Sequence, residues 1–153
     1  MAENAAGAKF NVITFGAMYL VLSRHTTSMP RQAEGDFRDG LEDDIQTLED
    51  RRFANVLVPL AATWMLIAGE QFHKLCKTNY CHEVREVSTR GKQFLWGKST
   101  GYSLARWAFW KKRFAEIATM QELENSVKDT AARAASEMER IEIAAREAAS
   151  EKA

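Results

Sequence analysis

The spacing of apolar side chains along the chain predicts a protein built of helices. Between residues 36 and 52 four apolar residues recur at intervals of four, four and three: Phe37, Leu41, Ile45 and Leu48. This spacing is typical of one buried face of a helix, so we expect a helix over 36–52. Acidic residues crowd its first turns, where the helix dipole favours negative charge.

The next segment, 53–77, combines a helical apolar face with an internal proline. Because proline suits a first turn and disrupts a helix interior, Pro59 predicts a kink or a fresh helix start near Val58. The apolar face after it consists of Leu60, Trp64, Ile67, Ala68, Phe72 and Leu75. Four small residues in the same segment would let another helix approach closely: Ala61, Ala62, Ala68 and Gly69.

Capping residues indicate two helices in the second half of the chain. Ser103 is a suitable N-cap for a helix over 104–118. Thr119 and Glu122 have the capping-box spacing and predict the start of a long final helix. Its apolar seam alternates at four and three residues: Leu123, Val127, Thr130, Ala134, Met138, Ile141, Ala145 and Ala148. We expect this alanine-rich seam to pack against the domain rather than form a free coiled coil.

The remaining segments complete the predicted architecture. Residues 10–24 are apolar on nearly every side, and their length favours a buried helix, although 12–15 are also good strand formers. We expect a loop over 25–34, a turn over 77–80, a shorter helix over 82–95 and a loop over 97–101. The fold class is therefore all-α. It is an irregular helical bundle of about five to six helices with a long C-terminal helix, and it forms a single domain, 9–150, after a flexible tail, 1–8.

Charge is balanced overall but unevenly distributed. Residues 34–52 carry eight acids and three bases, whereas 74–113 carry ten bases and two acids. A basic middle segment could attract nucleic acid. Since the formal net charge is zero, we instead expect oppositely charged helices to lie side by side, and the sequence argues against a nucleic-acid-binding protein.

Cysteine usage and hydropathy favour an intracellular protein. Two cysteines, Cys76 and Cys81, do not make a disulfide scaffold, so both thiols are expected to be free in a reducing compartment. The apolar stretch 10–22 is shorter than the roughly 20 residues of a membrane span and lacks a leader cleavage pattern. We expect a cytoplasmic protein without a membrane span, with the nucleus as the alternative.

One group of residues has the composition of a metal site. His73, Cys76, Cys81 and His82 place four nitrogen and sulfur donors within ten positions. The adjacent pair Cys81–His82 is awkward for chelating a single ion, and the spacing matches no standard zinc module. We therefore expect two ordinary thiols and two polar histidines, and no metal or other cofactor.

Catalytic motifs are not apparent in the sequence. Gly97-Lys98-Ser99 resembles part of a phosphate-binding loop, but that loop also requires a glycine five residues earlier, where Lys92 stands. Proximity of cysteine and histidine alone does not define an activated nucleophile. The sequence thus favours a protein that is not an enzyme.

The segment 103–114 is rich in both aromatic and basic side chains. We expect five large aromatic residues, from this segment and from 53–77, to form the structural core: Trp64, Phe72, Trp107, Trp110 and Phe114. Four residues of the same helix form a candidate interaction patch: Arg106, Phe109, Lys112 and Arg113. The preferred interpretation places them beneath the C-terminal helix, with Glu137, Glu139 and Glu142 as partners for the cations.

The same segment carries a resemblance to a known family. Leu95-Trp96-Gly97 followed by Gly101-Tyr-Ser-Leu-Ala-Arg-Trp-Ala-Phe-Trp-Lys-Lys-Arg-Phe-Ala-Glu-Ile-Ala118 resembles the pattern LW…GFSLERWxFWKxRFxEIA of the uncharacterised fungal family DUF3632. The resemblance is good over 95–142, weak over 53–76 and absent before, so the chain resembles a shortened member. It implies a helical, intracellular protein without an assigned activity, and no functional residue is carried over.

Two classes of function follow from these observations. The first is a non-catalytic helical interaction or scaffold protein that binds a protein partner or forms a homo-oligomer. The second is a small-molecule-binding protein or enzyme with a pocket lined by tryptophans: Trp64, Trp96, Trp107 and Trp110. A zinc module and a nucleic-acid-binding module are minor alternatives.

Overall fold

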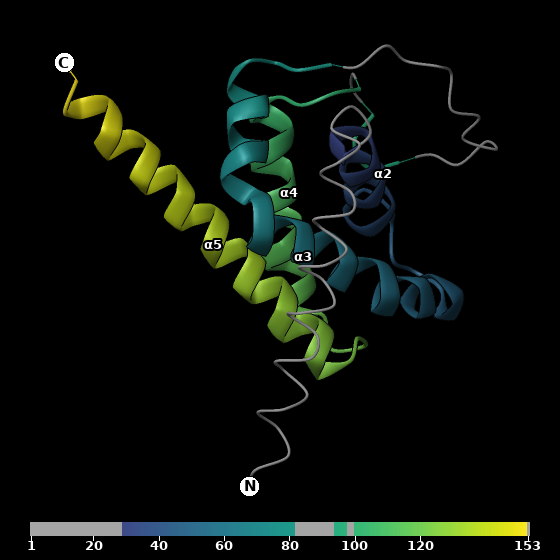
Figure 1. Cartoon of the computed structure of the whole chain (residues 1–153). Coiled ribbons are helices and arrows are strands. Elements are labelled where there is room, and N and C mark those ends of the chain that lie inside the picture. The colour runs from purple at the N-terminus through teal and green to yellow at the C-terminus, as the bar shows by residue number, and fades with distance from the viewer. Residues whose placement is uncertain (1–28, 82–93, 98–99, 153) are drawn as a thin grey trace, which may run out of the picture. The chain divides into compact units, whose positions relative to one another are not determined.

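The described part of the chain is helical. The computed structural model describes residues 29–81, 94–97 and 100–152, and among these it contains four helices and no strand (Figure 1). The chain separates into two compact units, Met1–Gln32 and Ala33–Ala153; of the first, the structure describes residues 29–32. The all-α fold class is confirmed. Four helices rather than five to six are found in the described residues, and the helix predicted over 10–24 lies outside them.

The first described helix, α2 (Met29–Leu41), differs from the prediction at both ends. It begins inside the predicted loop 25–34, where Pro30 stands in a first turn that tolerates proline. It ends at Leu41, so the helix predicted over 36–52 is wrong. The chain breaks there because Glu42 turns into the core, and Leu48, expected on the buried face, is 63% exposed.

The second described helix, α3 (Leu48–Lys77), starts with a capping box. The Thr47 hydroxyl accepts a hydrogen bond from the Asp50 amide at 3.1 Å, and the Asp50 carboxylate accepts one from the Thr47 amide at 2.7 Å. This reciprocal pair satisfies two amides that the helix leaves unbonded. Asp50 stands at the third helical position, where the usual capping-box pattern has glutamate or glutamine, so that pattern does not predict this helix start.

Helix α3 runs through Pro59, contrary to the break predicted near Val58. The irregular backbone lies further along, at Ala68, where φ is −131° and ψ is 19°. Val58, Ala61 and Ala62 are buried on either side of the proline, and this packing outweighs one lost backbone hydrogen bond. By length and composition α3 could also cross a membrane, but buried core helices have the same length and composition. In its most apolar stretch of 18 residues, 44% is buried in this structure.

Small residues bring the helices of the core close together, as predicted. A Cβ atom at Gly40 of α2 would lie 2.7 Å from the Leu57 carbonyl oxygen of α3. A Cβ atom at Gly69 would lie 2.7 Å from Cδ1 of Ile141 in the last helix. At Gly40 the neighbour is backbone, so a larger residue there would push α2 and α3 apart. At Gly69 the neighbour is the end of a flexible side chain, which can move aside.

The helix α4 (Leu104–Thr119) agrees with the prediction. Its N-cap is Ser103, whose hydroxyl accepts a hydrogen bond from the Arg106 amide at 3.1 Å. The turn expected over 77–80 is confirmed at Thr78 and Asn79, and Asn79 has a positive φ of 51°. The helix predicted over 82–95 lies outside the described residues except for 94–95, which are not helical.

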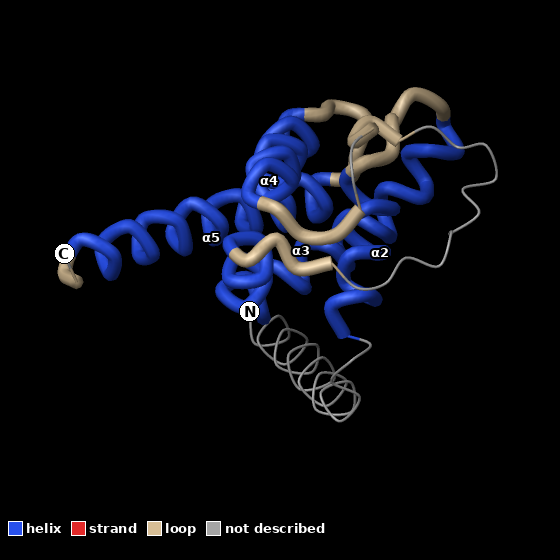
Figure 2. Tube along the Cα trace, turned by 90° about the horizontal axis from the view of Figure 1, so that it is seen from above, coloured by secondary structure: helices blue, strands red, loops and turns tan. Residues whose placement is uncertain are grey.

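The long final helix, α5 (Asn125–Ser150), packs against α3 and α4, as expected (Figure 1). Its predicted capping box is wrong, because Thr119 is the last residue of α4 and α5 begins after Glu124. The seam is buried from Leu123 to Ile141, with Ala131 in the place predicted for Thr130. Beyond Ile141 the seam leaves the core, and Figure 2 shows these last turns of α5 extending past α4.

Candidate functional site

The five residues predicted as structural core all lie in the interior. Trp64, Phe72, Trp107, Trp110 and Phe114 are each at most 8% exposed. Three tryptophan ring N–H groups donate to carboxylates at 2.7–2.8 Å: Trp64 to Asp36, Trp107 to Glu142 and Trp110 to Glu42. These rings therefore anchor the helices to one another, since buried indole N–H groups need such partners.

The candidate interaction patch is not a continuous surface. Arg106 and Arg113 are 3% and 7% exposed, and Phe109 is half-buried against Trp96 with ring centroids 5.2 Å apart. Of the four residues, Lys112 is the exposed one, and it lies 3.6 Å from Glu116. Most of this group is therefore buried.

Arg106 forms the centre of a buried ion-pair network. Its guanidinium donates to both carboxylate oxygens of Glu42, at 2.7 and 3.1 Å, to Glu34, and to the Gly101 carbonyl oxygen at 2.8 Å. Burial alone would lower the pKa of Arg106, but hydrogen bonds and attraction to the two glutamates raise it above its ordinary value. The cation is thus held charged inside the core.

The acids predicted to pair with Arg106 and Arg113 are not the ones that do so. Arg113 donates to the Leu41 carbonyl oxygen at 2.9 Å and pairs with Glu116 at 2.7 Å, and Arg106 pairs with acids at 34 and 42. The C-terminal glutamates Glu139 and Glu142 pair with Lys111 instead, at 2.7 and 2.6 Å. The two arginines face the α2 side of α4, whereas Lys111 faces α5.

The candidate metal ligands are divided between two environments. His73 and Cys76 are buried on α3, Cys81 is exposed, and His82 lies outside the described residues. In the part of the chain that the structure describes, no three His, Cys, Asp or Glu side chains are placed to hold a metal ion. Burial raises the pKa of the Cys76 thiol to about 12, which keeps it protonated and unreactive.

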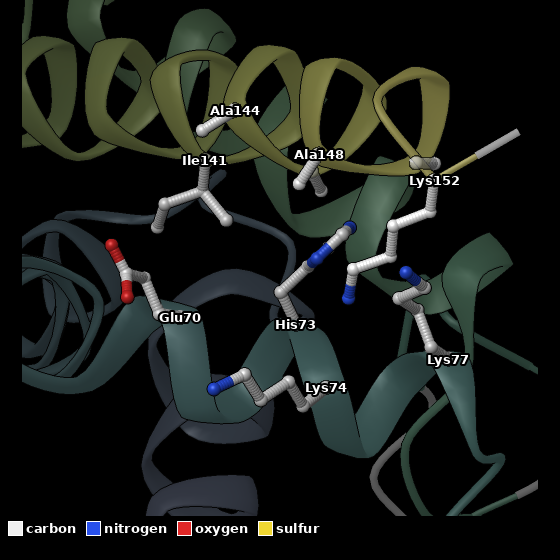
Figure 3. Close-up of a pocket in the computed structure, with 10 residues that line it drawn as sticks. Glu70, His73, Lys74, Lys77, Ile141, Ala144, Ala148 and Lys152 are labelled. Atoms are coloured by element: carbon white, nitrogen blue, oxygen red, sulfur yellow. The ribbon is translucent and has the colours of Figure 1, made fainter.

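A groove lies between the C-terminal halves of α3 and α5 (Figure 3). Its volume is about 520 Å³. The walls consist of Glu70, His73, Lys74 and Lys77 from α3, of Ile141, Ala144, Ala145, Ala148 and Ala149 from α5, and of Lys152, which follows α5. The groove opens where the α5 seam leaves the core, so its α5 wall is formed by small apolar side chains.

The groove is positively charged. Lys74, Lys77 and Lys152 line it, and none of them forms an ion pair with any residue that the structure describes. Glu70, at the opposite end in Figure 3, is paired with Arg140 at 3.2 Å. Lysines in the last turn of α3 also stabilise the helix dipole, so Lys74 and Lys77 favour the fold as well as shaping the groove.

His73 is a buried polar side chain that faces the groove. It is 8% exposed, and its ring packs edge-on against Trp107 with centroids 4.9 Å apart. Neither ring nitrogen has a hydrogen-bond partner within the described residues. Burial, assisted by the Lys77 charge, lowers the pKa of His73 below 6.5, although Glu142 opposes this effect. The imidazole is therefore neutral at pH 7, with one donor and one acceptor.

Sequence reasoning missed this groove because its walls come from distant segments. His73 was weighed as a zinc ligand, and Lys74, Lys77 and Lys152 were not singled out as binding residues. The alanines of the seam were the available signal, since they indicated a surface that packs closely with another element.

Comparison with known proteins gives the family. The model of the family described as "Protein of unknown function (DUF3632)" matches residues 4–114. No curated protein and no solved structure matches the chain. The match begins earlier than the resemblance over 95–142 suggested, and it covers the α3 wall of the groove but not the α5 wall. Because the match spans more than half of its length, this chain belongs to the DUF3632 family, whose function is unknown.

Proposed function

We propose that this protein is a non-catalytic helical interaction module and that the groove between α3 and α5 is the surface that receives its partner. The observation that carries the proposal is the groove itself: two helices with small side chains on one wall and, on the rim, lysines that form no ion pair with the described residues. Helix pairs of this kind accept a third helix, which packs its side chains between theirs.

The chemistry of the lining supports binding rather than catalysis. The polar groups that line the groove are Glu70, His73 and three lysines, and no hydroxyl or thiol of the described residues is among them. Glu70 is engaged with Arg140, so His73 has no carboxylate in the lining to orient it as a general base.

The alternative of a tryptophan-lined pocket has less support. None of the four tryptophans, all of them in the described part of the chain, lines the groove, and three of their ring N–H groups bind carboxylates within the fold. A small ligand in the groove itself remains the second candidate, because about 520 Å³ falls within the usual range of ligand sites. The two free thiols suit the cytoplasm or nucleus as its location.

Filling the groove tests the proposal. Ala148 is exposed and lines the groove, so Ala148→Phe should block it without disturbing the core. Ala132→Phe is a matched control on the same helix, since Ala132 is exposed and lies outside the groove. A partner that co-purifies with the wild-type chain is first identified and purified. Calorimetric titration then measures its affinity for the wild type, for Ala148→Phe and for Ala132→Phe.

We expect Ala148→Phe to weaken the binding by about tenfold or more, and Ala132→Phe to change it by less than about twofold. Equal affinities for both variants would exclude the groove as the binding surface. A wild-type chain that is strictly monomeric by light scattering and has no partner would contradict the interaction function itself.

A further inference from the structure

Three lysines and one buried histidine converge on the groove from helices that are distant in the sequence. Lys74 and Lys77 come from the last turns of α3, and Lys152 comes from the turn that follows α5. In Figure 3, His73, Lys77 and Lys152 lie at the same end, away from Glu70. Neighbouring cations without anions repel one another, so an acidic ligand would relieve a charge imbalance that the described fold leaves in place.

His73 defines where an acid would bind most closely. It is more than nine-tenths buried and lines the groove, and its two ring nitrogens lack partners in the described residues. A buried polar group without a hydrogen bond is costly, and a carboxylate that accepts the ring N–H would remove that cost. Trp107 holds the ring from behind by edge-on contact, so the donor is presented in a restricted orientation.

The α5 wall of the groove determines what kind of molecule can bring the acid. Ala144, Ala145, Ala148 and Ala149 offer a shallow apolar surface. Small side chains allow a third helix to approach α5 closely. The described lining has no Phe, Tyr or Trp side chain on which a nucleic-acid base could stack, and the His73 ring is already packed against Trp107. A helix with an apolar face and acidic edges matches both walls.

The segments of this chain outside the described residues do not have that charge. Residues 1–28 contain one acid and two bases, and 82–93 contain two acids and three bases. A second copy is less suited, because its α5 carries four bases among five acids, and three of those acids, Glu137, Glu139 and Glu142, are paired within the chain. The occupant is therefore sought in another protein.

We infer that the groove binds an acidic amphipathic helix of a partner protein, with its acids against Lys74, Lys77 and Lys152 and one carboxylate accepting the ring N–H of His73. This inference rests on the proposed function and adds the chemical class of the partner. It assigns His73 as the residue that selects a carboxylate, and the lysines as the groups that attract the acidic edge.

The test uses two synthetic peptides of about four helical turns. Both have alanine and leucine on one face; the other face carries glutamate in the first peptide and lysine in the second. Fluorescence anisotropy measures the binding of each labelled peptide to the full chain. We expect the glutamate peptide alone to bind, with an affinity that falls as salt rises from about 50 to about 300 mM.

Four variants distinguish the contribution of the lysine charges to binding from that of the His73 ring N–H. Lys77→Glu and Lys152→Glu should each weaken binding of the glutamate peptide by about tenfold, and the matched control Arg133→Glu, an exposed cation of α5 outside the groove, by less than about twofold. His73→Phe keeps a ring against Trp107 but removes the N–H, and it should weaken binding by about tenfold while the thermal unfolding midpoint confirms that the variant is folded.

Three results would overturn the inference. These are the absence of binding by the glutamate peptide, an equal loss in Arg133→Glu and Lys77→Glu, or tighter binding of a single-stranded oligonucleotide than of the peptide. If any of these occurs while Ala148→Phe still blocks the natural partner, the proposed function stands and the acidic class of partner is wrong. If Ala148→Phe leaves the natural partner bound, the proposed function is wrong as well.

Discussion

Replacing Arg106 by alanine is expected to lower the free energy of unfolding by about 3–5 kcal/mol. The guanidinium is 3% exposed and forms ion pairs with Glu34 and Glu42. Removing it leaves Glu42, which is 1% exposed, without a cation among the described residues, and the cost of burying an uncompensated charge dominates. Glu42 would retain the Trp110 ring N–H, and Glu34 the Gly101 amide, but neither donor carries a charge.

Chemical denaturation of the wild type and of Arg106→Ala measures this difference. Arg140→Ala is the control, because Arg140 pairs with Glu137 and Glu70 at 55% exposure, and a surface pair of this kind contributes less than about 1 kcal/mol. If both variants lose the same small amount, the Arg106 network is not a determinant of the fold.

Trp107→Ala is expected to be the second strongly destabilising substitution, also by about 3–5 kcal/mol. The ring is 1% exposed, donates to Glu142 at 2.8 Å and supports His73. Its removal leaves a cavity between α3, α4 and α5 that the remaining helices can fill only in part.

Thermal and denaturant unfolding of Trp107→Ala and Trp107→Phe distinguish packing from the hydrogen bond. Phenylalanine keeps most of the ring volume, and Glu142 keeps Lys111 as a partner at 2.6 Å. The free energy of unfolding of Trp107→Phe should therefore be much closer to that of the wild type than that of Trp107→Ala. A near-neutral Trp107→Ala would place this ring outside the core.

The parts of the fold that were predicted correctly depend on local signals. Ser103 caps α4 through a hydrogen bond to a residue three positions away, and the apolar residues of α4 that follow keep one helical phase. The seam of α5 continues in register from Val127 to Ile141. Signals of this range lie within a single helix, so the sequence alone is sufficient to find them.

The errors came from interactions across the chain. The helical phase of Phe37 and Leu41 continues to Leu48, but Glu42 leaves the helix to reach Arg106, 64 positions later. An arginine in an amphipathic helix is usually exposed, so nothing near Arg106 indicated that it would be buried. The groove was missed for the same reason, because His73 and Lys152 become neighbours only when α5 folds onto α3.

The central claim, that the α3–α5 groove is the binding surface, is tested most directly by amide hydrogen exchange of the full chain with and without its purified partner. We expect slower exchange over residues 70–77 and 141–152 in the complex, with α2 and the N-terminal half of α3 unchanged. Slower exchange confined to α2, the N-terminal half of α3 or α4, with the groove segments unchanged, would contradict it.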